Sequence, residues 1–263
     1  MKNISIAAVF MASVLFAAVQ LEAQIMVVGS LTHEQQASPG SGYAGVIKIQ
    51  NAGNAIQSVR VYQQDYLFYA DGRVLYPEAG TIQRSNAPWI SFRPNTLSIG
   101  PGQNRDISYR VFVPEEEQRG GTFWSVIMVE TVSSGENGNG EFTIRQVMRY
   151  AVQIVTQLGK GVADITVLDA GLENKKGQGT ALVIDLTNTG SSWIHPDVSV
   201  ELFSLQDGIL GPYTAPRKRI FPSTSMRFTV PLTGLSGGQY QAMAVIGGKE
   251  EEVFVVHYEL EVN

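Results

Sequence analysis

Apolar and polar residues alternate over short stretches of this chain, and turn residues separate the stretches at regular intervals. Residues 71–130 show the pattern most clearly, and they end in a continuous apolar stretch around Trp124. A period of two residues is typical of strands that bury one face, and Gly, Pro, Asn and Asp favour the turns between strands. No long stretch keeps a helical period. The pattern therefore predicts an all-β fold made of many short strands.

The same succession of strands and turns occurs twice along the chain. Residues 46–50 run into the turn 51–54, and residues 182–187 run into the turn 188–190. Both turns begin with Asn and contain Gly, the residues that best tolerate positive φ. We therefore expect two tandem immunoglobulin-like β-sandwiches, over residues 24–158 and 159–263. The further strands expected lie at residues 59–69, 142–156, 198–204 and 252–262.

Residues 1–23 have the features of a signal peptide. Lys2 supplies a positive start, residues 4–19 are apolar and uncharged, and Ala23 precedes the expected new N-terminus, Gln24. The apolar run is short for a membrane-spanning helix, which needs about 20 apolar residues. We therefore favour a cleaved leader over a membrane anchor. No second run of that kind follows, so no stable membrane insertion is expected.

Composition and motifs argue against catalysis. The chain contains 0 cysteines, which excludes thiol chemistry and thiolate metal sites, and its net charge of -5 offers no basic footprint for nucleic acid. His33, His195 and His257 fall in different predicted elements without the spacing of metal ligands. There is no nucleophile elbow and no phosphate-binding loop. We expect a protein that is not an enzyme and has no metal or cofactor.

The three tryptophans are expected in two environments. Trp124 opens an apolar stretch and is predicted to lie in the core. Trp89 follows Pro88 and Trp193 follows the second Asn-containing turn, so both are predicted to be exposed. Exposed aromatic side chains beside turns are compatible with glycan or protein contact.

The order and spacing of the turns in residues 71–130, followed by the Trp124 strand, resemble the first domain of PapD-like periplasmic chaperones. These proteins assemble surface fibres in bacterial envelopes. The leader, the two sandwiches and the lack of cysteine agree with the resemblance, which is best over residues 71–156. It implies a non-catalytic periplasmic chaperone or assembly factor whose partner is a secreted or surface-fibre subunit.

The resemblance also implies a binding strand. In this family the last strand of the first domain adds to the sheet of an incomplete subunit. That strand corresponds here to residues 142–154, and Phe142, Ile144 and Met148 are the expected partner-binding residues, because they follow a Ser-, Gly- and Asn-rich loop. The same alternation also fits a strand that fills the protein's own core, the reading that we favour for residues 150–154.

Members of this family further hold the partner's terminal carboxylate with two basic residues, one on the first strand and one on the binding strand. Arg149, with Arg145 further back on the same face, is the candidate on the binding strand. The first strand departs from the pattern, because residues 31–36 contain only His33 and no Arg or Lys. The alternative for both arginines is a solvated or cross-strand paired face.

A different class of function remains open. Two-domain surface proteins of Gram-positive bacteria share a similar sandwich layout, and by that analogy the chain is an envelope structural or adhesive protein. Its partner would be peptidoglycan or another surface protein. Such proteins usually carry a C-terminal membrane anchor, which the last residues, Glu261-Val262-Asn263, do not resemble. That difference favours the chaperone reading.

Overall fold

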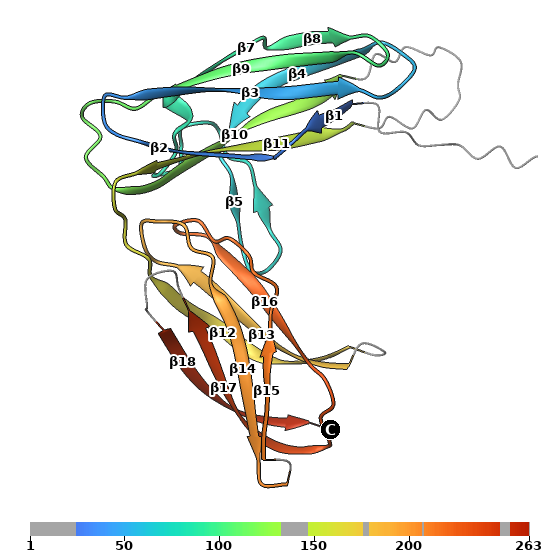
Figure 1. Cartoon of the computed structure of the whole chain (residues 1–263), viewed down its shortest axis with the longest axis vertical. Coiled ribbons are helices and arrows are strands. Elements are labelled where there is room, and N and C mark those ends of the chain that lie inside the picture. The colour runs from blue at the N-terminus through green and yellow to red at the C-terminus, as the bar shows by residue number, and fades with distance from the viewer. Residues whose placement is uncertain (1–24, 133–146, 176–178, 207, 248–252, 263) are drawn as a thin grey trace, which may run out of the picture.

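The computed structural model describes residues 25–132, 147–175, 179–206, 208–247 and 253–262. Their strands build two β-sandwiches that follow one another along the chain, with β1–β11 in the first and β12–β18 in the second (Figure 1). The expected all-β fold with two tandem immunoglobulin-like sandwiches is confirmed. The predicted leader, residues 1–23, lies outside the described residues. Within the described part, no helix is long and apolar enough to cross a membrane.

The first sandwich consists of two facing sheets and a small hairpin. In spatial order, one sheet contains β1 (Ile25–Val28), β3 (Gly42–Asn51), β9 (Asn104–Phe112) and β7 (Ile90–Arg93). The other contains β2 (Thr32–Ala37), β11 (Arg149–Leu158), β10 (Gly121–Val132), β4 (Gln57–Gln64) and β8 (Thr96–Ile99). The hairpin of β5 (Leu67–Phe68) and β6 (Val74–Leu75) reaches toward the second sandwich (Figure 1), and a short 3-10 helix, η1 (Ala87–Trp89), precedes β7.

The second sandwich also has two facing sheets. One contains β12 (Ile165–Lys175), β13 (Gly179–Asn188) and β16 (Ser225–Leu232). The other contains β15 (Gly208–Thr214), β14 (Asp197–Ser204), β17 (Gly238–Gly247) and β18 (Val253–Val262). β7 in the first sandwich and β18 in the second are thus edge strands of their sheets.

The first strand of the chain changes sheets. β1 pairs with β3 in one sheet, and after Gly29 the chain continues as β2, which pairs in parallel with β11 in the other. Gly29 has φ +101°, a conformation that residues with a side chain rarely adopt. Because β2 begins only at Thr32, it pairs with β11 from Gln153 onward. The crossing thus decides how much of β11 is covered.

The central strand β10 is buried on both faces. Ile127 and Val129 point into the core of the first sandwich, whereas Trp124 points to the opposite face and joins a cluster that includes Phe221 of the second sandwich. Successive side chains of a strand alternate between faces, so β10 contributes both to the core of the first sandwich and to the cluster that contains Phe221. The prediction that Trp124 is buried is confirmed.

The internal repeat extends to individual hydrogen bonds. The amide nitrogen of Asn51 donates to the carbonyls of Ala55 and Ile99, and its amide oxygen accepts from the N–H of Gly53. Asn188 makes the same set of bonds at the end of β13, to residues 190, 192 and 220. Both side chains are buried. Each Asn therefore closes the turn predicted for it by satisfying main-chain groups inside its sandwich.

One predicted strand is interrupted. Residues 59–69 alternate like a single strand, but β4 ends at Gln64 and a new pairing begins at β5. Asp65 lies between them, and its buried carboxylate accepts hydrogen bonds from the main-chain N–H groups of Thr81 and Ile82 and from the hydroxyl of Ser85. Asp65, at the point where the strand is interrupted, therefore holds the loop of residues 81–85 in place.

Candidate functional site

Only part of β11 has neighbours on both edges. Its C-terminal residues, 153–158, lie between β10 and β2, whereas residues 149–152 pair with β10 alone. The N–H of Gln153 donates to the carbonyl of Leu31 at 2.8 Å, so this residue's main-chain groups face away from β10. Main-chain groups alternate along an antiparallel strand, and those of Arg149 and Ala151 therefore face the same side. Among the described residues, no strand pairs with them there.

The side chains around this open edge differ from those further along β11. Val147 is half exposed and Met148 half-buried, while Val152 and Ile154 are fully buried. Tyr150 packs against the core of the first sandwich, and its hydroxyl donates to the carbonyl of Ile25 at 2.9 Å. The reading of residues 150–154 as part of the protein's own core is confirmed.

Two of the predicted site residues, Met148 and Arg149, are among the residues that the structure describes. Phe142, Ile144 and Arg145 lie outside the described residues. Met148 directly precedes β11, and its carbonyl accepts a hydrogen bond from the N–H of Thr131 at 3.0 Å. Arg149 is the first residue of β11. Met148 and Arg149, which are neighbours in the sequence, thus lie at the start of β11, where its edge is open.

The guanidinium of Arg149 is paired with a carboxylate of the same sheet. Its Nε donates to Glu130 at 2.6 Å, and Glu130 also accepts from Arg60 and from the hydroxyl of Tyr62, each at 2.7 Å. The Glu130 side chain is 10% exposed and that of Arg149 is 51% exposed. Burial by itself raises the pKa of Glu130, but the hydrogen bonds from Tyr62, Arg149 and Arg60 outweigh it and hold that pKa below its usual range.

The cluster around Glu130 should weaken in acid. Because its pKa is lower in the folded than in the unfolded chain, Glu130 stabilises the fold above the ordinary glutamate pKa of about 4.3 and loses this effect as the pH falls through the lower, folded value. We expect Glu130→Gln to lower the free energy of unfolding by about 1 kcal/mol at pH 7, since two partners are exposed. Urea unfolding at pH 7 and pH 3 should show this difference shrinking; an equal difference at both values would contradict it.

A second polar cluster connects β2 to the second sandwich. Glu34 accepts a hydrogen bond from the indole N–H of Trp193 at 2.7 Å and pairs with Arg219 at 3.0 Å, and the Arg219 guanidinium lies 4.0 Å from the centre of the Trp193 ring. His33 instead hydrogen-bonds the hydroxyl of Tyr109 at 2.9 Å. The prediction that Trp193 is exposed is wrong, because the ring is half-buried between the two sandwiches. Residues 31–36, where the resemblance implies a basic residue, therefore contribute the carboxylate of Glu34 to the contact between the two sandwiches.

Trp89 is also half-buried, since its ring packs against Phe123 with 4.7 Å between ring centres. The exposure predicted for Trp89 is therefore also wrong, here because the ring packs within the first sandwich.

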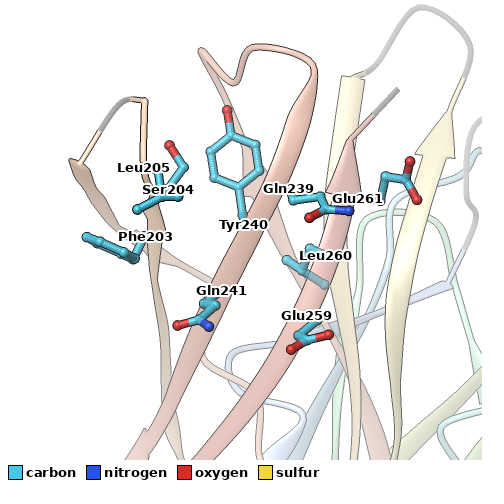
Figure 2. Close-up of a pocket in the computed structure, with 9 residues that line it drawn as sticks. All are labelled: Phe203, Ser204, Leu205, Gln239, Tyr240, Gln241, Glu259, Leu260 and Glu261. Atoms are coloured by element: carbon cyan, nitrogen blue, oxygen red, sulfur yellow. The ribbon is translucent and has the colours of Figure 1, made fainter.

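No catalytic arrangement is evident in the described part of the chain. Within it, no three His, Asp or Glu side chains lie close enough together to hold a metal ion. A hollow of about 470 Å³ lies at the ends of β14, β17 and β18 (Figure 2). The polar side chains at its rim include Gln239, Glu259 and Glu261.

Neither a scan against protein-family models nor a search of curated proteins finds a match to this chain. Solved structures do resemble it. The match to the class 5 fimbriae chaperone CfaA covers 89% of this chain and 98% of CfaA, at 11% sequence identity and a TM-score of 0.48. The match to the complex of the SafA pilin with the SafB chaperone from Salmonella enterica covers 90% of this chain and 96% of the other, at 12% identity and a TM-score of 0.44. The match to the E. coli chaperone DraB covers 90% of this chain and 98% of DraB, at 11% identity and a TM-score of 0.42.

At these identities the likeness is one of fold. Several solved structures that this chain is similar to over about nine tenths of its length are fimbrial chaperones.

Proposed function

We propose that this chain is a non-catalytic periplasmic chaperone that binds secreted or surface-fibre subunits by β-strand addition. The observation that supports the proposal most is the open edge of β11, where the main-chain groups of Arg149 and Ala151 have no neighbouring strand among the described residues. An unpaired edge is a template for a further strand, and main-chain hydrogen bonds supply much of the affinity in such complexes. The predicted leader, residues 1–23, would deliver the chain to the compartment in which such subunits are assembled.

Specificity would come from the side chains next to the edge. Met148, together with Phe142 and Ile144, would supply apolar contacts to the incomplete subunit. Arg149, with Arg145, is the proposed anchor for a carboxylate of the partner. Only the Nε of Arg149 donates to Glu130 and the side chain is 51% exposed, so its remaining N–H groups could donate to a carboxylate of the partner.

Replacing Ala151 with proline tests the proposal at the main chain. Proline lacks the N–H that faces the open edge, whereas the pairing with β10 uses the groups of residues 150 and 152. Proline is tolerated on an edge strand when the missing N–H would face solvent. We expect capture of a co-expressed surface subunit to weaken by at least about tenfold, because one hydrogen bond is lost and the ring obstructs a strand about 4.8 Å away.

Ala151→Val is the matched control, because it also changes the side chain but keeps the N–H. Capture is measured by co-purification of the tagged mature chain with the subunit, after circular dichroism has shown that both variants are folded. Deuterium exchange should also show that residues 149–152 become protected when the subunit binds. Equal capture by the two variants would count against strand addition at this edge. The peptidoglycan alternative stays a prediction, which sedimentation with purified murein tests.

A further inference from the structure

Two arginines on the outer face of the first sandwich lack a side-chain partner. Most described arginines donate to a carboxylate or a carbonyl, but Arg93 of β7 and Arg110 of β9 make no side-chain hydrogen bond or ion pair with any described residue. Both side chains are exposed. In the β7–β9 register, Ser91 lies opposite Arg110 and Arg93 lies opposite Ser108. The two arginines are thus diagonal neighbours, about 7–8 Å apart at the main chain.

These arginines border a hollow with a small-residue floor. The hollow has a volume of about 600 Å³, and besides the two arginines its outward-facing lining consists of Ala44, Val46, Ser91 and Ser108. Two adjacent positive charges without a carboxylate between them repel each other. A complementary anionic surface placed on the hollow would remove that repulsion and cover the exposed Val46.

The outer face of the second sandwich carries the opposite charge. Glu259 and Glu261 both point outward from the edge strand β18, and neither side chain has a partner among the described residues. Residues two apart on a strand are about 6.8 Å apart. Beside them, Phe203 is half exposed and Leu205, just past the end of β14, is 96% exposed. These four side chains line the hollow of Figure 2.

The two faces match in charge, in spacing and in lateral order. On the first face the charges lie on β7 and β9 and the apolar Ala44 and Val46 lie on β3, the next strand inward. On the second face the charges lie on β18, the apolar Phe203 lies on β14 and Leu205 lies just past its end, and β17 runs between β18 and β14. Placed face to face, the arginine pair meets the glutamate pair while apolar side chains meet apolar side chains.

From this match we infer that the outer face of the second sandwich of one copy docks onto the outer face of the first sandwich of another copy. The contact joins two different surfaces, so it is heterologous, and each copy keeps one face free for a further copy. The first face belongs to the sheet that does not contain β11. The open edge of β11 therefore lies on the other sheet, and the inference does not depend on the proposed chaperone function.

Sedimentation velocity of the mature chain over a range of concentrations tests the inference. We expect average mass to rise with concentration at low salt and to fall back at high salt, since exposed charges are screened beyond about 8 Å at physiological ionic strength. Arg93→Glu with Arg110→Glu, or Glu259→Arg with Glu261→Arg, should each weaken self-association by roughly tenfold or more. The control Arg73→Glu with Arg105→Glu changes the net charge of the chain as much as the first pair, at exposed positions outside both faces.

A mixture of the two charge-reversed variants gives the sharpest result. Each variant alone brings like charges together at the contact, but in the mixture the reversed arginine face of one meets the reversed glutamate face of the other, and their unchanged faces also match. We therefore expect association to return in the mixture. The inference is overturned if the unmodified chain stays monomeric at about millimolar concentration, if the control pair weakens association equally, or if the mixture associates no better than its components.

Discussion

Replacing Trp124 with alanine is expected to lower the free energy of unfolding by about 3–5 kcal/mol and to loosen the joint between the two sandwiches. The indole is 2% exposed, stacks on Phe221 with 4.8 Å between ring centres and 11° between planes, and donates its N–H to the carbonyl of Tyr66 at 2.7 Å. The truncation leaves a cavity between the sandwiches and an unpaired carbonyl. Urea unfolding measures the first effect, and small-angle scattering should show a wider range of domain orientations.

Two further variants separate the contributions of the ring. Trp124→Phe keeps an aromatic face but loses the hydrogen bond to Tyr66, so it should cost less than the alanine variant. Phe221→Ala removes the other half of the stack, and a double-mutant cycle with Trp124→Ala should give a coupling of about 0.5–1.5 kcal/mol. A loss below about 1 kcal/mol for Trp124→Ala would mean that the stack does not hold the joint.

The position of the strands could be predicted from the sequence because the relevant signal is local. A half-buried strand alternates by itself, so the strands expected at residues 46–50, 182–187 and 198–204 lie within β3, β13 and β14. The two Asn-initiated turns were equally visible, since Asn and Gly are needed at the turn itself. The break at Asp65 was not visible, because its cause is a loop 16 residues further along the chain.

The candidate site could be predicted only in part, because its key contacts join distant residues. The partner of Trp193 is Glu34, 159 residues away, so nothing beside either residue in the sequence indicates that they meet. The extent of the open edge depends on where β2 begins to cover β11, and thus on the change of sheets at Gly29. The one available signal is Gly29 itself, between the apolar residues 25–28 and the mostly polar residues 30–36, and it does not reveal which strand pairs next.

A second large loss of stability is expected for variants of Asp65, a residue that no sequence pattern indicates. Its carboxylate is fully buried and accepts hydrogen bonds from Thr81 at 2.7 Å, from Ile82 at 2.9 Å and from the hydroxyl of Ser85. Asp65→Ala leaves these buried donors without an acceptor. A bond to a charged group contributes about 1.5–3 kcal/mol, so after partial relaxation we expect a loss of about 3–5 kcal/mol in the free energy of unfolding.

Asp65→Asn separates the contribution of the carboxylate's hydrogen bonds to stability from the contribution of side-chain volume, because Asn is nearly the same size as Asp. Its amide oxygen can still accept from Thr81 and Ile82, and Ser85 can rotate its hydroxyl to accept from the new amide group, so a loss of about 1–2 kcal/mol is expected. The effect should also spread toward β11. Asn86, next to Ser85, donates to the carbonyl of Ile154 in β11 at 2.9 Å. If the loop of residues 81–86 loosens, β11 loses this hydrogen bond. Deuterium exchange should therefore rise at residues 81–86 and 152–156 in Asp65→Ala but little in Asp65→Asn, and equal behaviour of the two variants would refute this role of the carboxylate.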